Sequence, residues 1–254
     1  MNVLKKIFFT SFSAGLLLAS YGLNAQQTTA DIVGNALVHG DRPAADAADD
    51  ARRMPLEVLA FAGLQPGMSV FELEAGGGYY TEIISRVVGP AGTVVMHNPP
   101  SFDSFLGDSV ATRVADNRLS NVRVSRTNFN SLEAPDNAFD MVTWILGPHE
   151  LGFEPGGESL GDPETAFAEI ARILKPGGLF LAVDHIAEAG SGVEVGGTLH
   201  RISEELVTEH AQRAGMTVVR SSNLHKNDDD PLDIGVFDSS IQGQTSKFVV
   251  LYRN

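Results

Sequence analysis

The sequence predicts an α/β fold in which a mainly parallel, twisted sheet carries helices on both faces. After the Pro66-Gly67 turn, residues 70–73 are apolar except for Glu72 and predict a short strand, three glycines follow at 76–78, and residues 80–88 carry an apolar stripe at helical spacing. A strand, a glycine loop and a helix in this order form the first unit of a nucleotide-binding α/β fold. Apolar strands and helices then alternate as far as residue 184, as they do where parallel strands are joined by crossover helices.

The remaining elements follow from hydrophobic periodicity and from proline and glycine punctuation. Further strands are predicted at 93–96, 122–126, 139–146, 179–183, 217–220 and 247–252, and helices at 44–53, 56–62, 108–119, 163–174 and 203–214. Residues 187–198 are rich in glycine and small side chains, so a mobile loop is expected there. The acidic run Asp228-Asp229-Asp230 is expected to be a solvated loop, with weak calcium binding as the alternative.

The first 25 residues have the pattern of a secretory signal peptide. Lys5 and Lys6 precede a mostly apolar run over 7–20, and small residues end at Ala25, where cleavage is predicted. The apolar run is short for a membrane anchor, so the mature protein is expected to be exported, periplasmic or secreted, without stable membrane insertion. The predicted organisation is a signal peptide over 1–25, a helical segment over 26–63 and the main domain over 64–254.

The charge of the mature chain bears on its partners. Without Lys5 and Lys6, 16 basic residues are set against 32 acidic ones, a formal charge of −16. Such a surface repels nucleic acids and anionic membranes, so a small molecule is the expected partner, while the oligomeric state stays open. The chain has no cysteine, and its folded state therefore contains no disulfide.

Three motifs carry a resemblance to a known family: Glu72-Leu73-Glu74-Ala75-Gly76-Gly77-Gly78, Phe139-Asp140-Met141-Val142 and Leu174-Lys175-Pro176-Gly177-Gly178. Together they resemble the class I S-adenosylmethionine-dependent methyltransferases. A narrower group of exported bacterial proteins is similar at 75–82, at Asp184-His185 and at 198–201. The resemblance implies a Rossmann-like class I methyltransferase fold with S-adenosylmethionine as cofactor.

The same resemblance implies a set of cofactor-binding residues, namely Glu72, Glu74, Gly76, Gly78, Tyr80, Asn98, Asn128 and Phe129. Three of these depart from the family pattern. Glu74 stands where the family usually has a glycine, Asn98 where an acid binds the ribose hydroxyls, and Asn128 where an acid lies near the adenine amine. An amide can still hydrogen-bond a hydroxyl, but without the assistance of a charge. Phe129 is expected to stack on the adenine ring.

Three histidines are the predicted catalytic residues. His149 and His185 follow the fourth and fifth strands, and His200 lies beyond the glycine-rich loop. Ligands of open α/β sheets bind outside the carboxyl ends of the strands, where a histidine can act as a general base. Structural or solvent-facing roles are the alternative for each. No spacing such as His-x-x-x-His occurs, so no metal site is predicted, although His149, Asp184, His185 and His200 are a conceivable set.

The predicted function is therefore methyl transfer from S-adenosylmethionine to an unidentified small molecule. The alternative is an exported, catalytically inactive binding or accessory protein that keeps the fold and has lost the donor. The altered residues at positions 74, 98 and 128 and the predicted export motivate this alternative, because the donor is made in the cytosol. Affinity for the donor separates the two hypotheses.

Overall fold

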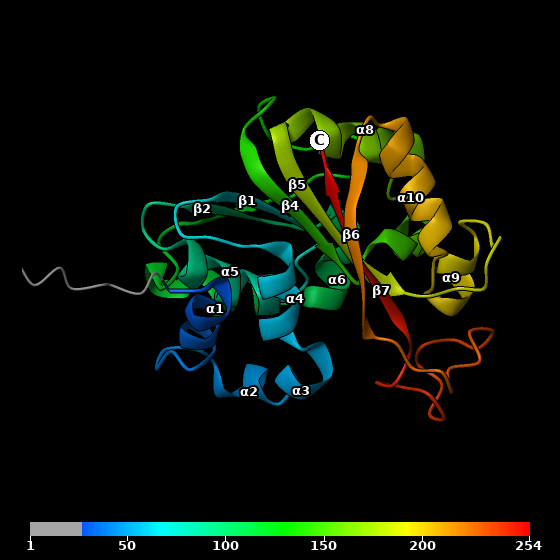
Figure 1. The fold of residues 1–254 in the computed structure, drawn as a ribbon, viewed down its shortest axis with the longest axis horizontal. Coiled ribbons are helices and arrows are strands. Elements are labelled where there is room, and N and C mark those ends of the chain that lie inside the picture. Colours follow the sequence, from blue (N-terminus) through cyan, green and yellow to red (C-terminus); the bar gives the residue numbers. More distant parts are fainter. Residues whose placement is uncertain (1–26) are drawn as a thin grey trace, which may run out of the picture.

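The computed structural model describes residues 27–254 and contains a seven-stranded sheet with helices on both faces (Figure 1). The strands are β1 (Ser69–Leu73), β2 (Thr93–His97), β3 (Val122–Ser125), β4 (Phe139–Ile145), β5 (Leu174–His185), β6 (Thr217–His225) and β7 (Lys247–Arg253). They lie in the order β3-β2-β1-β4-β5-β7-β6. The first five are parallel, and β7 runs antiparallel to both of its neighbours. The predicted fold class is confirmed.

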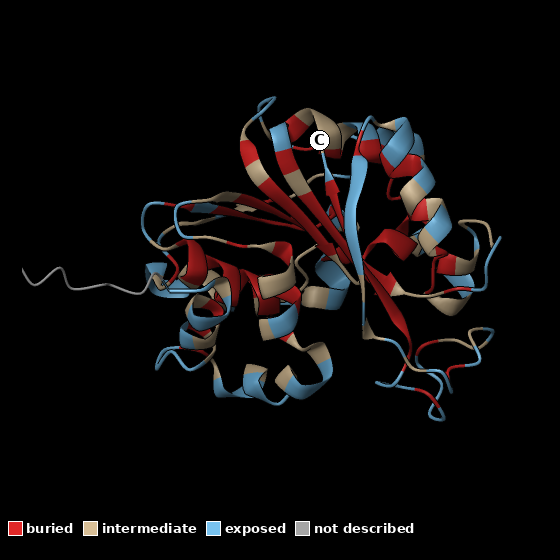
Figure 2. Cartoon of the chain, in the orientation of Figure 1, coloured by how far each residue is buried: buried red, intermediate tan, exposed pale blue. Residues whose placement is uncertain are grey.

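Each face of the sheet has its own apolar core. Helices α1 (Thr29–Leu37), α4 (Pro55–Ala62) and α5 (Tyr79–Val88) cover one face, and α8 (Pro163–Ile173) and α10 (Glu204–Arg213) cover the other. Successive residues of a strand point to opposite faces, so Val70 packs in the first core whereas Phe71 and Leu73 pack in the second. The central strands are buried, and the edge strand β6 is largely exposed (Figure 2).

Short helices fill the connections between the main elements, and two of the predicted helices differ from those observed. They are α2 (Ala44–Ala47), α3 (Asp50–Arg53), α6 (Asp103–Leu106), α7 (Ser109–Val114) and α9 (Val195–Leu199), with 3₁₀ turns at Pro100–Phe102, Ala115–Asn117, Pro148–Gly152 and Pro155–Gly157. The single helix predicted at 44–53 is wrong, because its carboxylates bind groups outside it: Asp46 accepts from Arg113, and Asp50 from Tyr79. The helix predicted at 108–119 ends at Val114, since Asp116 has a φ of +54°.

The prediction of a mobile loop over 187–198 is wrong in its second half, where α9 forms. This helix packs against the 3₁₀ turn Pro148–Gly152. A Cβ on Gly196 would collide with the carbonyl oxygen of His149, and one on Gly152 would collide with that of Val193. The glycines thus permit two backbones to touch, which fixes the position of the chain leading to His200.

Gly196→Ala is expected to destabilise the fold by about 1–3 kcal/mol, because the new methyl group must push α9 away from the turn. Gly34→Ala is the matched control, since it also replaces a helical glycine but meets only a Leu56 methyl group at 3.9 Å. Helix propensity predicts a gain of up to about 1 kcal/mol there. Urea unfolding of both variants measures the difference, and equal stability of the two would contradict the close packing of α9.

The acidic run after β6 is only partly solvated. Asp228 and Asp229 are exposed, but Asp230 is buried and forms a two-pronged ion pair with the fully buried Arg201, at 2.8 and 2.9 Å. The Arg201 guanidinium also donates to the carbonyl oxygens of Ile186 and Ile234. The prediction of a solvated loop is therefore wrong for Asp230, which ties residues 226–246 to the chain around His200.

None of the helices within residues 27–254 has the length and apolar character needed to cross a membrane. The predicted signal peptide and the first residue of the predicted 26–63 segment lie outside the described residues.

Candidate functional site

The glycine loop between β1 and α5 turns through left-handed backbone conformations. Glu74, Gly76 and Gly78 have φ values of +54°, +57° and +84°. A carboxylate-bearing residue in this conformation is uncommon, and the position favours glycine. Glu74 is held there by Trp144, whose indole Nε1 donates to its Oε2 at 2.9 Å. Burial, followed by the negative charge of Glu150, raises the pKa of Glu74 well above its usual value.

Asn98 lies behind this loop. Its side chain is fully buried, with Oδ1 accepting from the Gly76 N–H at 2.8 Å and Nδ2 donating to the Gly76 carbonyl at 3.0 Å. The amide matches both a donor and an acceptor of one peptide backbone, which a carboxylate cannot do. Asn98 therefore positions the glycine loop from behind. Its predicted contact with a ribose stays a prediction.

Asn98→Asp is expected to destabilise the protein by about 1–3 kcal/mol at neutral pH, because a carboxylate oxygen would face the Gly76 carbonyl. The loss of unfolding free energy should be smaller at acid pH, because a protonated carboxyl can donate to the Gly76 carbonyl as the amide does. As the pH rises and the carboxyl ionises, the variant loses this donor and becomes less stable. Asn128→Asp is the control: Asn128 follows β3 and is exposed, so this substitution should change the free energy of unfolding by no more than about 0.5 kcal/mol. Thermal unfolding at acid and neutral pH measures both variants. If they lose the same stability, Asn98 does not position the glycine loop.

A cavity of about 420 Å³ opens in front of the loop. It is lined by Glu72, Glu74, Gly76 and Tyr80 from the predicted set, and by Asp46, Asp49 and Arg53 from the segment that covers it. The Tyr80 hydroxyl donates to the Arg53 carbonyl at 3.0 Å, so it anchors this cover. Burial raises the pKa of Glu72 to about 8, against the opposing effect of the 2.5 Å hydrogen bond from Thr81.

A second cavity, of about 600 Å³, adjoins the first through Arg53, Gly76 and Leu146, which line both. Its walls are mostly apolar and comprise Phe102, Phe105, Leu106, Leu146, Phe153, Val236 and Phe237. Six polar side chains also line it: Arg52, Arg53, His149, Glu150, His185 and His200. The structure thus brings together all three predicted catalytic histidines, from β5 and from the segments after β4 and α9.

Besides Asn98, three residues of the predicted cofactor set line neither cavity. Asn128 is exposed beyond β3, and Gly78 packs against Arg113 and Met96 at the start of α5. Phe129 is fully buried in the core, with its ring centroid 4.8 Å from that of Trp144. A fully buried phenylalanine has no free face on which an adenine ring could stack. In this structure Phe129 packs in the core.

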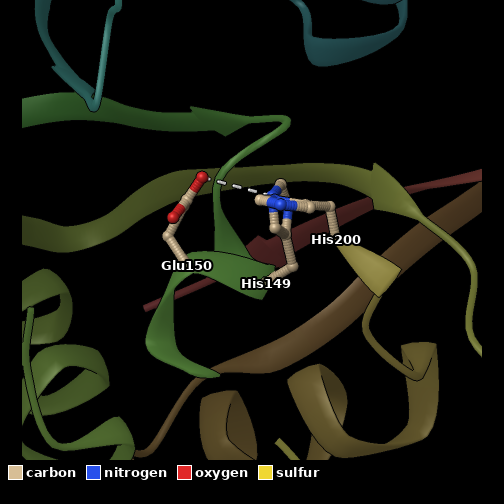
Figure 3. Close-up of side chains that lie close together, drawn as sticks. All are labelled: His149, Glu150 and His200. Carbon is tan, nitrogen blue, oxygen red and sulfur yellow. Dashed lines mark ion pairs between the residues drawn. The ribbon is translucent and has the colours of Figure 1, made fainter. Parts of the chain in front are cut away.

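The histidines form a tight cluster with two carboxylates. The His149 Nδ1 lies 2.9 and 3.0 Å from the oxygens of the fully buried Asp184. Its Nε2 lies 3.3 Å from a carboxyl oxygen of Glu150, the contact that is dashed in Figure 3. The His200 ring is 5.4 Å from the His149 ring, between centroids. Burial alone would lower the pKa of His149, but the charge of Asp184 and the hydrogen bond to it raise the pKa well above its usual value. Burial lowers the pKa of His200.

His185 points into the same cavity but is held differently. Its Nδ1 lies 2.7 Å from the Thr245 hydroxyl. Burial, with the nearby positive charge of Lys247, lowers its pKa far below the usual value, so the imidazole is neutral.

Several lining residues escaped the sequence analysis. Arg53 and Asp49 reach the first cavity because α2 and α3 fold over the glycine loop, a placement that no local pattern encodes. Glu150 adjoins His149 in the sequence and is not among the predicted site residues. Phe153 and Phe237 come from irregular segments far apart in the chain. Only tertiary packing brings these groups together.

Comparison with known proteins bears on the fold and on the family. A family model described as a methyltransferase domain matches residues 72–182, which run from the end of β1 to β5. Residues 72–182 belong to the class I S-adenosylmethionine-dependent methyltransferase superfamily. The cofactor of that superfamily is the one that the sequence predicts. The three motifs that carry the resemblance, at 72–78, 139–142 and 174–178, all lie within the matched residues.

Two curated relatives of this chain are named as methyltransferases. The ubiquinone/menaquinone biosynthesis C-methyltransferase UbiE of Shewanella halifaxensis is 32% identical over 123 residues, covering 48% of this chain and 45% of that protein. UbiE of Saccharophagus degradans is 28% identical over 136 residues, or 54% and 50% of the two chains. The matched segment thus spans about half the length of these relatives.

Solved structures resemble the chain over a larger share. A SAM-dependent methyltransferase from Aquifex aeolicus superposes with a TM-score of 0.60 at 22% identity, covering 82% of this chain and 94% of that one. The [4+2]-cyclase SpnF gives a TM-score of 0.58 at 20% identity, with 82% and 81% coverage. At this identity the likeness establishes the fold, and the second name shows that the fold carries more than one chemistry.

Proposed function

We propose that this protein transfers a methyl group from S-adenosylmethionine to a small, largely apolar molecule. The observation that carries the proposal is the pair of adjoining cavities: one lies on the glycine loop, the other has apolar walls and a polar cluster, and Gly76 lines both. A methyl donor and its acceptor must meet in this manner, because the transfer depends mainly on alignment of the nucleophile with the sulfonium methyl group.

The residues of the first cavity suit the donor. A Cβ on Gly76 would meet no atom within 4 Å, so this glycine leaves open space in front of the loop. Glu72 and Glu74, whose pKa values burial raises, offer carboxyl oxygens to the amino group, and the positive charges of the donor would favour their ionised forms. Arg53 offers a guanidinium to the carboxylate of the donor. When bound, the cofactor supplies an electrophilic methyl group. Asn98 holds the loop, and Tyr80 holds the cover above it.

The second cavity suits the acceptor. Aromatic and aliphatic side chains would bury its apolar body, whereas His200 and Glu150 would face its reacting end. His200, whose pKa burial lowers, is neutral at physiological pH and is able to accept a proton from a hydroxyl or carbon acid. Phe105 and Phe237 line the cavity but are themselves 66% and 67% exposed, so they would keep water from the methyl group only when the acceptor packs against them.

The second candidate is an exported binding protein without methyltransferase activity. It is favoured by the carboxylate of Glu74 in the loop and by Asn98, whose amide is already engaged by Gly76. The proposed export adds to it, because the donor is made in the cytosol. Under this hypothesis the apolar cavity binds a ligand, and the first cavity no longer binds S-adenosylmethionine.

Calorimetric titration of S-adenosylmethionine and S-adenosylhomocysteine into the full chain separates the two candidates. We expect dissociation constants in the micromolar range, about −8 kcal/mol, for a donor held by several charge-assisted contacts. The absence of heat at millimolar ligand would leave the fold in place and favour the binding protein.

A further inference from the structure

We propose that His149, Glu150 and His200 form a binding site for a divalent transition-metal ion, with zinc as the ion that they fit best. One potential ligand atom from each residue lies within 4.8 Å of the other two (Figure 3). His149 and Glu150 come from the 3₁₀ turn after β4, and His200 follows α9, which is locked onto that turn through its glycines. The site thus rests on two backbones in contact.

The distances suit a metal. Two atoms bound to one zinc ion at about 2.0–2.1 Å with a tetrahedral angle lie roughly 3.3 Å apart. The His149 Nε2 and the Glu150 Oε1 are 3.3 Å apart. The His200 ring, half-buried and with its centroid 5.4 Å from that of His149, would have to move closer for all three ligand atoms, now within 4.8 Å of one another, to reach one ion. Two histidines and one glutamate, with a fourth position open, are a ligand set of catalytic zinc sites.

Asp184 completes the arrangement from behind. Both its oxygens lie within 3.0 Å of His149 Nδ1, which keeps a proton on this nitrogen, so an ion bound at Nε2, on the side of Glu150 and His200, would displace the second proton of the ring. Metal-binding histidines are almost always held in this manner by a carboxylate on the other ring nitrogen. Asp184 is fixed in turn by the backbone N–H groups of His149 and His185.

Glu150 supplies an independent observation. The residue is more than nine-tenths buried, yet its Oε2 accepts no hydrogen bond within the described part of the chain. A buried carboxylate oxygen without a partner is costly. A cation beside Glu150 would satisfy that oxygen.

The open position of the ion would face the apolar cavity, so it would take an oxygen or sulfur atom of the bound small molecule. With the ion in place, His200 would be its ligand and would not serve as the proton acceptor. This extension rests on the proposed function, since it makes the ion a partner of the methyl acceptor; the ion site itself does not. Zinc binding without donor binding would uphold the site and defeat the methyltransferase proposal, and the reverse result would do the opposite.

The test is equilibrium dialysis of the full chain against zinc in metal-free buffer, followed by metal quantification and by the visible spectrum of the cobalt(II) form. We expect one equivalent of zinc and a cobalt spectrum of low coordination number. His200→Asn, which tolerates the left-handed backbone there, and Glu150→Gln should each weaken zinc binding by roughly 100-fold or more, and Asp184→Asn by about 10–100-fold. His39→Ala, at an exposed histidine elsewhere, should change nothing.

A second measurement uses only the unaltered protein, in case a variant fails to fold. Zinc should protect His200 from diethylpyrocarbonate while His39 stays reactive, as read by mass spectrometry. Wild-type protein that binds no zinc, variants that bind it as well as wild type, or equal modification of His200 with and without zinc would each overturn the site.

Discussion

Asp230→Ala is expected to lower the free energy of unfolding by about 3–5 kcal/mol, because it leaves the fully buried guanidinium of Arg201 without its counter-charge. The same carboxylate accepts from the Ser246 N–H at 2.6 Å, so the segment that returns to β7 should loosen as well. Urea unfolding, followed by the fluorescence of the buried Trp144, measures the loss.

Asp229→Ala is the matched control, since Asp229 is the exposed neighbour in the same acidic run. Its stability should stay within about 0.5 kcal/mol of wild type. If the two substitutions cost the same, the ion pair does not hold the segment around His200.

Gly76→Leu is expected to reduce affinity for S-adenosylmethionine by roughly 100-fold or more, equivalent to about 2.7 kcal/mol. The reason is geometric: the space beyond the Gly76 Cα is open, and the residue lines both cavities, so the new side chain would occupy the space proposed for the donor. The backbone cost at a φ of +57° is about 1–2 kcal/mol, which leaves the fold intact.

Gly67→Leu controls for that backbone cost. Gly67 also has a positive φ and open space around it, but it lies in the turn before β1 and lines neither cavity. Its stability should fall by a similar amount while donor affinity stays unchanged. If calorimetry gives the two variants equal affinity for the donor, the donor does not sit on the glycine loop.

The fold could be predicted from the sequence because its signals are local. Apolar strands, the glycine loop and the helix of residues 79–88 each occupy one continuous stretch, and parallel strands joined by helices leave few topologies. The failures came where distant contacts decide the outcome. The segment at 44–53 breaks because Asp46 binds Arg113, and the glycines before His200 serve close packing, which composition alone cannot distinguish from flexibility.

The candidate site could likewise be predicted only where local signals decide the position of a residue. Histidines at the ends of β4 and β5 could be expected to meet, since the carboxyl ends of parallel strands share one edge of the sheet. Positions assigned by resemblance were less informative. Asn98 turns its amide to the loop, and Phe129 turns into the core, because neighbouring side chains rather than strand position set their direction.

A crystal structure of the full chain with S-adenosylhomocysteine would show whether the donor site lies on the glycine loop. We expect the ligand there, with its amino acid end near Glu72 and Arg53 and its sulfur between Gly76 and Leu146, facing the apolar cavity. A ligand bound elsewhere, or crystals in which the loop cavity stays empty at millimolar concentration, would contradict it.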